Sequence, residues 1–189
     1  MMPIPRWVGA LIVSLYPKTR VNGFSVRFTD ITVDRSECAL RLHRALRLVA
    51  RVGRHYETLL SRIKYIVVWP GDRVFADERG GIHIASSDLL GIAELALASV
   101  LVHEATHLRI SALGVRFEPA QRERIERLCV REQAAFLRSA SGEGEELARE
   151  AEEMLKYPWW TPEQREADLD SLLRSHGLPR WLKAVLPRS

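Results

Sequence analysis

The chain has 189 residues, of which 47% are hydrophobic and 28% are charged, a composition that excludes wholesale intrinsic disorder. The length predicts one domain over residues 1–189 with a single sizeable core. Lys and Arg exceed Asp and Glu by 28 to 24, but the arginines are spread along predicted helices and form no aromatic-flanked block, so we do not expect nucleic-acid binding.

The first apolar segment is WVGALIVSLY, residues 7–16. Ten residues are too few to span a bilayer, and no small-residue cleavage site follows them. We therefore expect no transmembrane segment and interpret these residues as a buried first strand or short helix, with a signal or anchor as the alternative. The next residues, YPKTRVNG, are typical of a turn.

Strands and one long helix are predicted for residues 1–91. Residues 24–34 alternate apolar and polar side chains, as a half-buried strand does, whereas residues 36–63 carry apolar side chains at helical spacing. A second strand at 65–69 ends at a Pro-Gly turn. Residues 73–85 predict a hairpin, with its turn near Gly80-Gly81 and with Ile82 and Ile84 on one face.

Helices are predicted for most of residues 92–189. The first covers 92–113 and stops at Gly114; others follow over 119–140, 145–156 and 163–176. The chain is therefore predicted to be α+β, with a small N-terminal mixed sheet and a helical C-terminal half.

The two cysteines, Cys38 and Cys129, lie far apart in the chain and form no CxxC pair. We expect no disulfide between them and a location in the reducing cytoplasm.

The helix over 92–113 contains the motif His103-Glu104-Ala105-Thr106-His107. Side chains four residues apart lie on one face of a helix, so both imidazoles can reach one ion, and zinc favours such nitrogen ligands. Glu104 lies beside them, where it can take a proton from a zinc-bound water. The apolar residues around the motif predict an enclosed helix, in which three unpartnered polar groups would be costly.

A third ligand is expected from the next helix, because the metzincin pattern would need Gly and His where this chain has Ile110 and Leu113. Glu123, Glu126 and Glu132 compete for the role. Glu132 lies on an apolar stripe, where a carboxylate requires a cation, so periodicity favours it. Glu126 is favoured by spacing, because eighteen residues separate it from His107.

The pattern HEATH-x18-Glu resembles the gluzincin branch of the zincin-like metallopeptidases, in which a downstream helix supplies a glutamate at about this distance. The segment RIERLCVREQAAFLR (124–138) is also similar to a group of small bacterial zincin-like proteins. The resemblance covers roughly residues 80–138. It implies Zn2+ held by His103, His107 and Glu126, with Glu104 as general base in peptide-bond hydrolysis.

Two further features of the family, a strand that pairs with the substrate and a residue that stabilises the transition state, can each be assigned to this chain in more than one way. An edge strand that pairs with the substrate backbone precedes the active helix in zincins, and GGIHIA (80–85) is either that strand or an interior one. Tyr157, His83 and His176 are each candidates for stabilising the transition state. Trp159-Trp160 either line a groove for substrate or anchor the C-terminal segment.

The leading hypothesis is therefore a small zinc-dependent metallopeptidase that acts on a peptide or protein. The alternative is a non-catalytic module that uses the zincin scaffold for binding or regulation.

Overall fold

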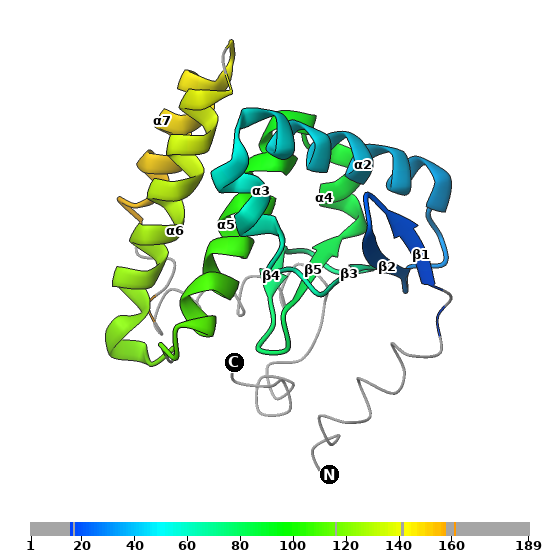
Figure 1. The fold of residues 1–189 in the computed structure, drawn as a ribbon, viewed down its shortest axis with the longest axis horizontal. Helices are drawn as coiled ribbons and strands as arrows, with labels where there is room; N and C mark the ends of the chain where they lie inside the picture. Colours follow the sequence, from blue (N-terminus) through cyan, green and yellow to red (C-terminus); the bar gives the residue numbers. More distant parts are fainter. Residues whose placement is uncertain (1–15, 17, 116, 141, 158–160, 162–189) are drawn as a thin grey trace, which may run out of the picture.

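The computed structural model describes residues 16, 18–115, 117–140, 142–157 and 161 (Figure 1). The predictions for residues 7–15, Trp159-Trp160 and the helix over 163–176 with His176 lie outside this range. The described part confirms the α+β prediction, because helices accompany a five-stranded mixed sheet in the order β1-β2-β3-β5-β4.

The strands are β1 (Lys18–Val21), β2 (Phe24–Phe28), β3 (Tyr65–Trp69), β4 (Phe75–Ala76) and β5 (Gly81–Ala85). The three central strands β2, β3 and β5 are parallel, and β1 and β4 add antiparallel strands at the two ends. The predicted hairpin with Ile82 and Ile84 on one face is confirmed, since β4 pairs with β5 and both isoleucines are fully buried.

Two strand predictions were wrong at their boundaries. Residues 18–21, predicted to be part of a turn, form β1, and the turn is confined to Asn22 and Gly23, whose φ angles are 47° and 84°. The strand predicted to reach residue 34 ends at Phe28. Asp30 stops it, because its carboxylate accepts hydrogen bonds from the backbone and hydroxyl of Thr32 and from Ser86.

The helices are α2 (Arg35–Val52), α3 (Arg54–Leu60), α4 (Ser86–Gly91), α5 (Glu94–Ala112), α6 (Pro119–Ser139) and α7 (Gly144–Met154). Helices α2 to α5 lie on one side of the sheet, α6 runs beside α5, and α7 packs against α6 (Figure 1). No helix within the described residues is both long and apolar enough to cross a membrane.

The single helix predicted over residues 36–63 is two helices. Gly53 has an extended backbone (φ 159°, ψ 163°), so the hydrogen-bond ladder of α2 stops there and α3 begins at Arg54. Apolar periodicity continues across the break, which is why the sequence pattern gives no sign of it.

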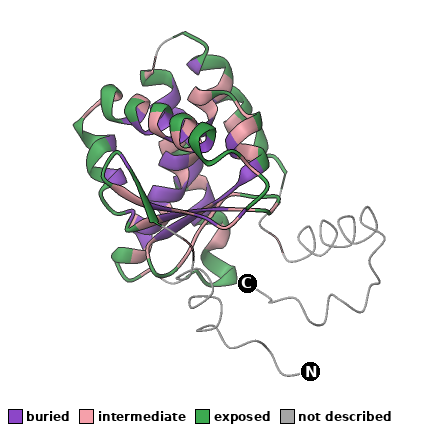
Figure 2. Cartoon of the chain, turned by 90° about the vertical axis from the view of Figure 1, so that its right-hand side faces the viewer, coloured by how far each residue is buried: buried purple, intermediate pink, exposed green. Residues whose placement is uncertain are grey.

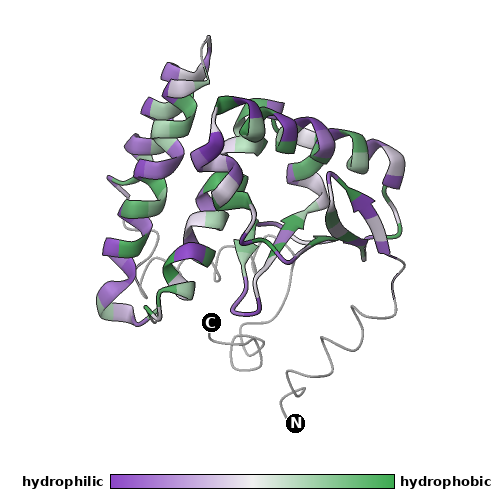
Figure 3. Cartoon of the chain, in the orientation of Figure 1, coloured by the Kyte–Doolittle hydropathy of each residue, from purple (hydrophilic) through white to green (hydrophobic). Residues whose placement is uncertain are grey.

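The core lies between the sheet and the helices. Val26, Ile66 and Ile82 on the strands are fully buried and belong to one cluster with Leu42 of α2 and Leu101 of α5. Figure 2 shows buried residues along the strands and the inner sides of the helices, and Figure 3 shows that these surfaces are hydrophobic. This core fixes α5 against the sheet.

Strand β5 is an interior strand of the sheet. It pairs with β3 on one side and with β4 on the other, so within the described residues the edge is β4. The structure therefore decides the question left open for GGIHIA in favour of an interior strand.

A half-buried carboxylate holds the turn between β4 and β5. Asp77 accepts hydrogen bonds from the Tyr65 hydroxyl (2.5 Å), from His83 Nε2 (2.9 Å) and from the backbone amides of Arg79 and Gly81. Burial by itself would raise the pKa of Asp77, but these hydrogen bonds outweigh it and lower the pKa to about 2.

Asp77 is expected to make folding stability fall in acid. A carboxyl whose pKa is lower in the folded chain than its ordinary 3.8 stabilises the fold above about pH 4, and the contribution is lost as pH falls towards 2. The shift corresponds to about 2 kcal/mol at neutral pH. Chemical denaturation of wild type and Asp77→Asn should show that difference at pH 7 and a much smaller one near pH 2.

The exposed Asp72 provides the control for this experiment, since its side chain is 51% accessible. Asp72→Asn should change stability little at either pH. A deficit of Asp77→Asn that persists unchanged at pH 2 would show that the carboxylate charge is not what stabilises the turn.

Candidate metal centre

Helix α5 places both histidines of the motif on one side. His103 and His107 are one turn apart, and their Nε2 atoms lie 3.1 Å from each other. The helix runs without a break to Ala112 and ends at Leu113 and Gly114, where glycine takes a positive φ of 80°. Both imidazoles face α6 and are only 12% exposed.

Helix α6 brings Glu126 to the two histidines. Its Oε2 atom lies 3.5 Å from His103 Nε2 and 3.3 Å from His107 Nε2. Zinc held tetrahedrally at about 2.0–2.2 Å requires nitrogen and oxygen ligands that are about 3.3–3.5 Å apart. The three atoms therefore have the mutual spacing that one zinc ion needs.

The Glu126 carboxylate lacks the partners that such a buried group needs. Its Oε2 atom is buried and accepts no hydrogen bond from any residue that the structure describes. Burial raises the pKa of Glu126, but the imidazoles of His103 and His107, 3.5 and 3.3 Å away, outweigh it and lower the pKa to about 2. A cation between the carboxylate and the imidazoles would give the buried Oε2 atom the direct partner that it lacks.

A chain of hydrogen bonds fixes the tautomer of His103. The Ser99 hydroxyl donates to the Ala96 carbonyl and accepts from the side-chain amide of Gln133. The oxygen of Gln133 is thereby left facing His103 Nδ1 at 3.1 Å, so Nδ1 carries the proton. His103 Nε2 then presents a lone pair towards Glu126 and His107, as a metal ligand must.

Gln133→Leu is expected to weaken zinc binding about 10- to 100-fold, because the side chain at position 133 would no longer accept the hydrogen bond that orients His103. Competition with a zinc-sensitive dye measures the change, and circular dichroism checks the fold. Gln121→Leu, at an exposed position near the start of the same helix, serves as control and should bind as wild type does. Equal affinities for the two variants would contradict the orienting role.

Cys129 also faces the site. Its Sγ atom, one ring nitrogen of His103 and one of His107 lie within 4.8 Å of one another, so these three residues form a group that could hold a metal. The thiol is fully buried, and burial raises its pKa, as do the neighbouring Glu126 and Glu104 carboxylates. From the sequence, Cys129 was considered only as a disulfide partner of Cys38. Its position three residues after Glu126 is the signal that could have identified it.

Glu104 lies on α5 next to the histidines and is 7% exposed. The backbone amide of Ala76, in the edge strand β4, donates a hydrogen bond to its carboxylate. Burial raises the pKa of Glu104, the two imidazoles partly offset this, and Glu126 adds to it. A carboxylate with a raised pKa beside a metal-ligand set is suited to accepting a proton.

The competing glutamates lie elsewhere. The carboxylate of Glu132 contacts His55 Nε2 at 2.6 Å and Arg109 at 3.5 Å. The cation expected beside a carboxylate on an apolar stripe is therefore the side chain of Arg109 and not a metal ion. Glu123 pairs with Arg127 on the surface and is 56% exposed. Of the three candidates, the structure brings Glu126 alone to the histidines.

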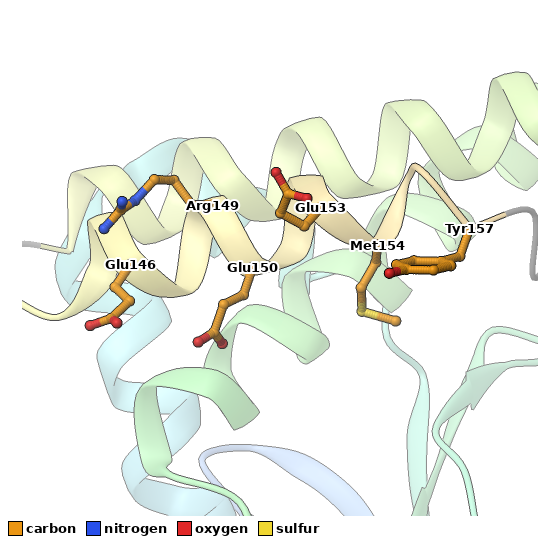
Figure 4. A pocket seen from close by; sticks show the side chains of 6 residues that line it. All are labelled: Glu146, Arg149, Glu150, Glu153, Met154 and Tyr157. Carbon is orange, nitrogen blue, oxygen red and sulfur yellow. The ribbon is translucent and has the colours of Figure 1, made fainter.

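The described candidates for a transition-state-stabilising residue have other surroundings. His83 is bound to Asp77 and stacks on Phe75, with ring centroids 4.6 Å apart. Tyr157 is 70% exposed and lines an open hollow of about 350 Å³ on α7 (Figure 4). That hollow is lined by Glu146, Arg149, Glu150, Glu153, Met154 and Tyr157, and thus by none of the residues around His103.

The comparisons with known proteins leave the interpretation to the site itself. No protein-family model matches the chain, and no match was found among curated proteins or solved structures.

Proposed function

We propose that the protein is a zinc-dependent metallopeptidase. The observation that carries the proposal is the convergence of His103 Nε2, His107 Nε2 and the unpartnered Glu126 Oε2, all within 3.5 Å of one another. Nitrogen and carboxylate donors in this number are what a catalytic zinc site takes from a protein, with a fourth position kept open.

The proposed mechanism divides the work between the ligands and Glu104. His103, His107 and Glu126 would hold the ion, which would polarise the scissile carbonyl and acidify water. Glu104 would accept the proton of the attacking water and pass it to the departing amine. The hydrogen bond from Ala76 would keep the Glu104 carboxylate in place through both transfers.

The substrate is proposed to be a peptide or protein, and the location a reducing compartment such as the cytoplasm. Both cysteines are free and buried, which agrees with a reducing environment.

A second candidate function is a non-catalytic module in which the metal has a structural role. The low exposure of the imidazoles, 12% each, favours it, because a catalytic site must admit a substrate. Incubation with an unfolded protein and a peptide library distinguishes the two functions. Hydrolysis that stops with chelator and returns with zinc supports the peptidase.

The first test of the proposal is the metal content. We expect elemental analysis of protein purified without chelator to give about one zinc per chain, and His103→Ala to contain little. The half-buried His43 of α2, which lies outside the motif, offers a control, since His43→Ala should keep its zinc. A wild-type chain that contains no metal and takes up none would overturn the proposal.

A further inference from the structure

Cys129 has the position of a metal ligand, although the peptidase mechanism gives it no role. It lies on α6 three residues after Glu126, so both side chains leave the same face of the helix. Its sulfur lies within 4.8 Å of one ring nitrogen of His103 and of one ring nitrogen of His107. Thiolate is among the strongest zinc ligands in proteins.

The surroundings of Cys129 leave two interpretations of its burial. Ile110 and Ile125 pack against it, as they would against any small apolar side chain. Packing alone does not account for the Oε2 atom of Glu126 one turn away, which is buried, has no hydrogen-bond partner among the described residues and lies 3.5 and 3.3 Å from the same two imidazoles. That oxygen independently indicates a cation beside the two imidazoles that the sulfur also approaches.

We propose that Cys129 is a fourth, displaceable ligand of the metal in the resting protein. The inference rests on the metal site proposed above and adds a regulation of it. With two imidazoles, one carboxylate and one thiolate, a tetrahedral zinc ion has no open position. The thiol gives its proton to solvent as the sulfur binds and takes one up when it leaves, so the exchange with water requires no oxidant.

Ligation by Cys129 would keep the peptidase latent. Water and the substrate carbonyl reach the ion only after the sulfur has left, so hydrolysis is slowed by the fraction of chains in the closed form. The low exposure of the imidazoles agrees with a resting site closed to solvent. Removal of the sulfur is therefore expected to raise activity several-fold.

Cobalt substitution tests the ligand directly, without using activity. Co2+ bound to a thiolate absorbs in the near ultraviolet by sulfur-to-metal charge transfer, and Co2+ bound only to nitrogen and oxygen does not. We expect the full chain loaded with one equivalent of Co2+ to show this band and Cys129→Ala to lose it. Cys38→Ala is the matched control, because Cys38 is also fully buried but lies in α2, and it should keep the band.

The outcomes separate the two proposals. Metal binding at one equivalent without the band, in wild type and in Cys38→Ala, overturns the role of Cys129 and leaves the metal site intact. Absence of metal binding overturns both. Because Cys38→Ala retains only Cys129, the band in that variant supports the proposal even where Cys129→Ala does not fold.

Discussion

Glu104→Gln is expected to reduce peptide hydrolysis by about 10²- to 10⁴-fold, the contribution of a positioned general base, at unchanged zinc content. Glutamine has the same shape and volume and can still accept the hydrogen bond from Ala76, but it cannot take up a proton at neutral pH. The measurement is a peptidase assay on both proteins after their zinc has been matched by elemental analysis. Folding should be nearly unchanged, because no contact is removed.

Glu132→Gln is the matched control for this experiment, since Glu132 is a partly buried glutamate bound to His55 and Arg109 and not to the histidines of the motif. It should hydrolyse peptides at the wild-type rate. Equal rates for Glu104→Gln and wild type would remove the catalytic role of Glu104. A wild type that cleaves nothing would favour the non-catalytic module.

The second large effect is expected at the third ligand. Glu126→Ala should lower zinc affinity by at least about 100-fold, because losing a residue that only hydrogen-bonds to a metal ligand already lowers affinity by about 10- to 100-fold. Glu132→Ala should retain the wild-type affinity. Thermal unfolding gives an independent measurement, because a ligand that binds only the folded chain raises its stability. Chelator should lower the melting temperature of wild type and of Glu132→Ala, and should leave that of Glu126→Ala nearly unchanged.

Loss of zinc in Glu132→Ala with full affinity in Glu126→Ala would mean that the third ligand has been assigned to the wrong glutamate, although the site would stand. Full affinity in both would exclude a carboxylate ligand from α6.

The local part of the site could be predicted from the sequence, because helical periodicity alone places His103, Glu104 and His107. The choice between Glu126 and Glu132 could not be made from periodicity. The stripe that carries Glu132 correctly predicts a cation, but the cation is Arg109 of α5, and the other contact of the carboxylate, His55, lies 77 residues away in the chain. The pairing of Gln133 with Ser99 likewise depends on how α5 and α6 pack, which no window of sequence contains.

The fold shows the same division between local and long-range information. Helices α5, α6 and α7 begin and end within about two residues of their predicted bounds, because glycine, proline and apolar spacing act locally. The neighbours of β5 depend on β3 and on the two residues of β4, and the helix break at Gly53 depends on a backbone conformation. Neither leaves a mark in the hydrophobic pattern.

The hydrogen-bond donor to the Glu104 carboxylate affects which amino acids position 76 can tolerate. It is the main-chain amide of Ala76, and every amino acid except proline has that amide. Position 76 can therefore change its side chain freely, within the space available, without the carboxylate losing its anchor. The orientation of the Glu104 carboxylate thus depends on the backbone of β4, and substitutions at position 76 other than proline should leave it unchanged.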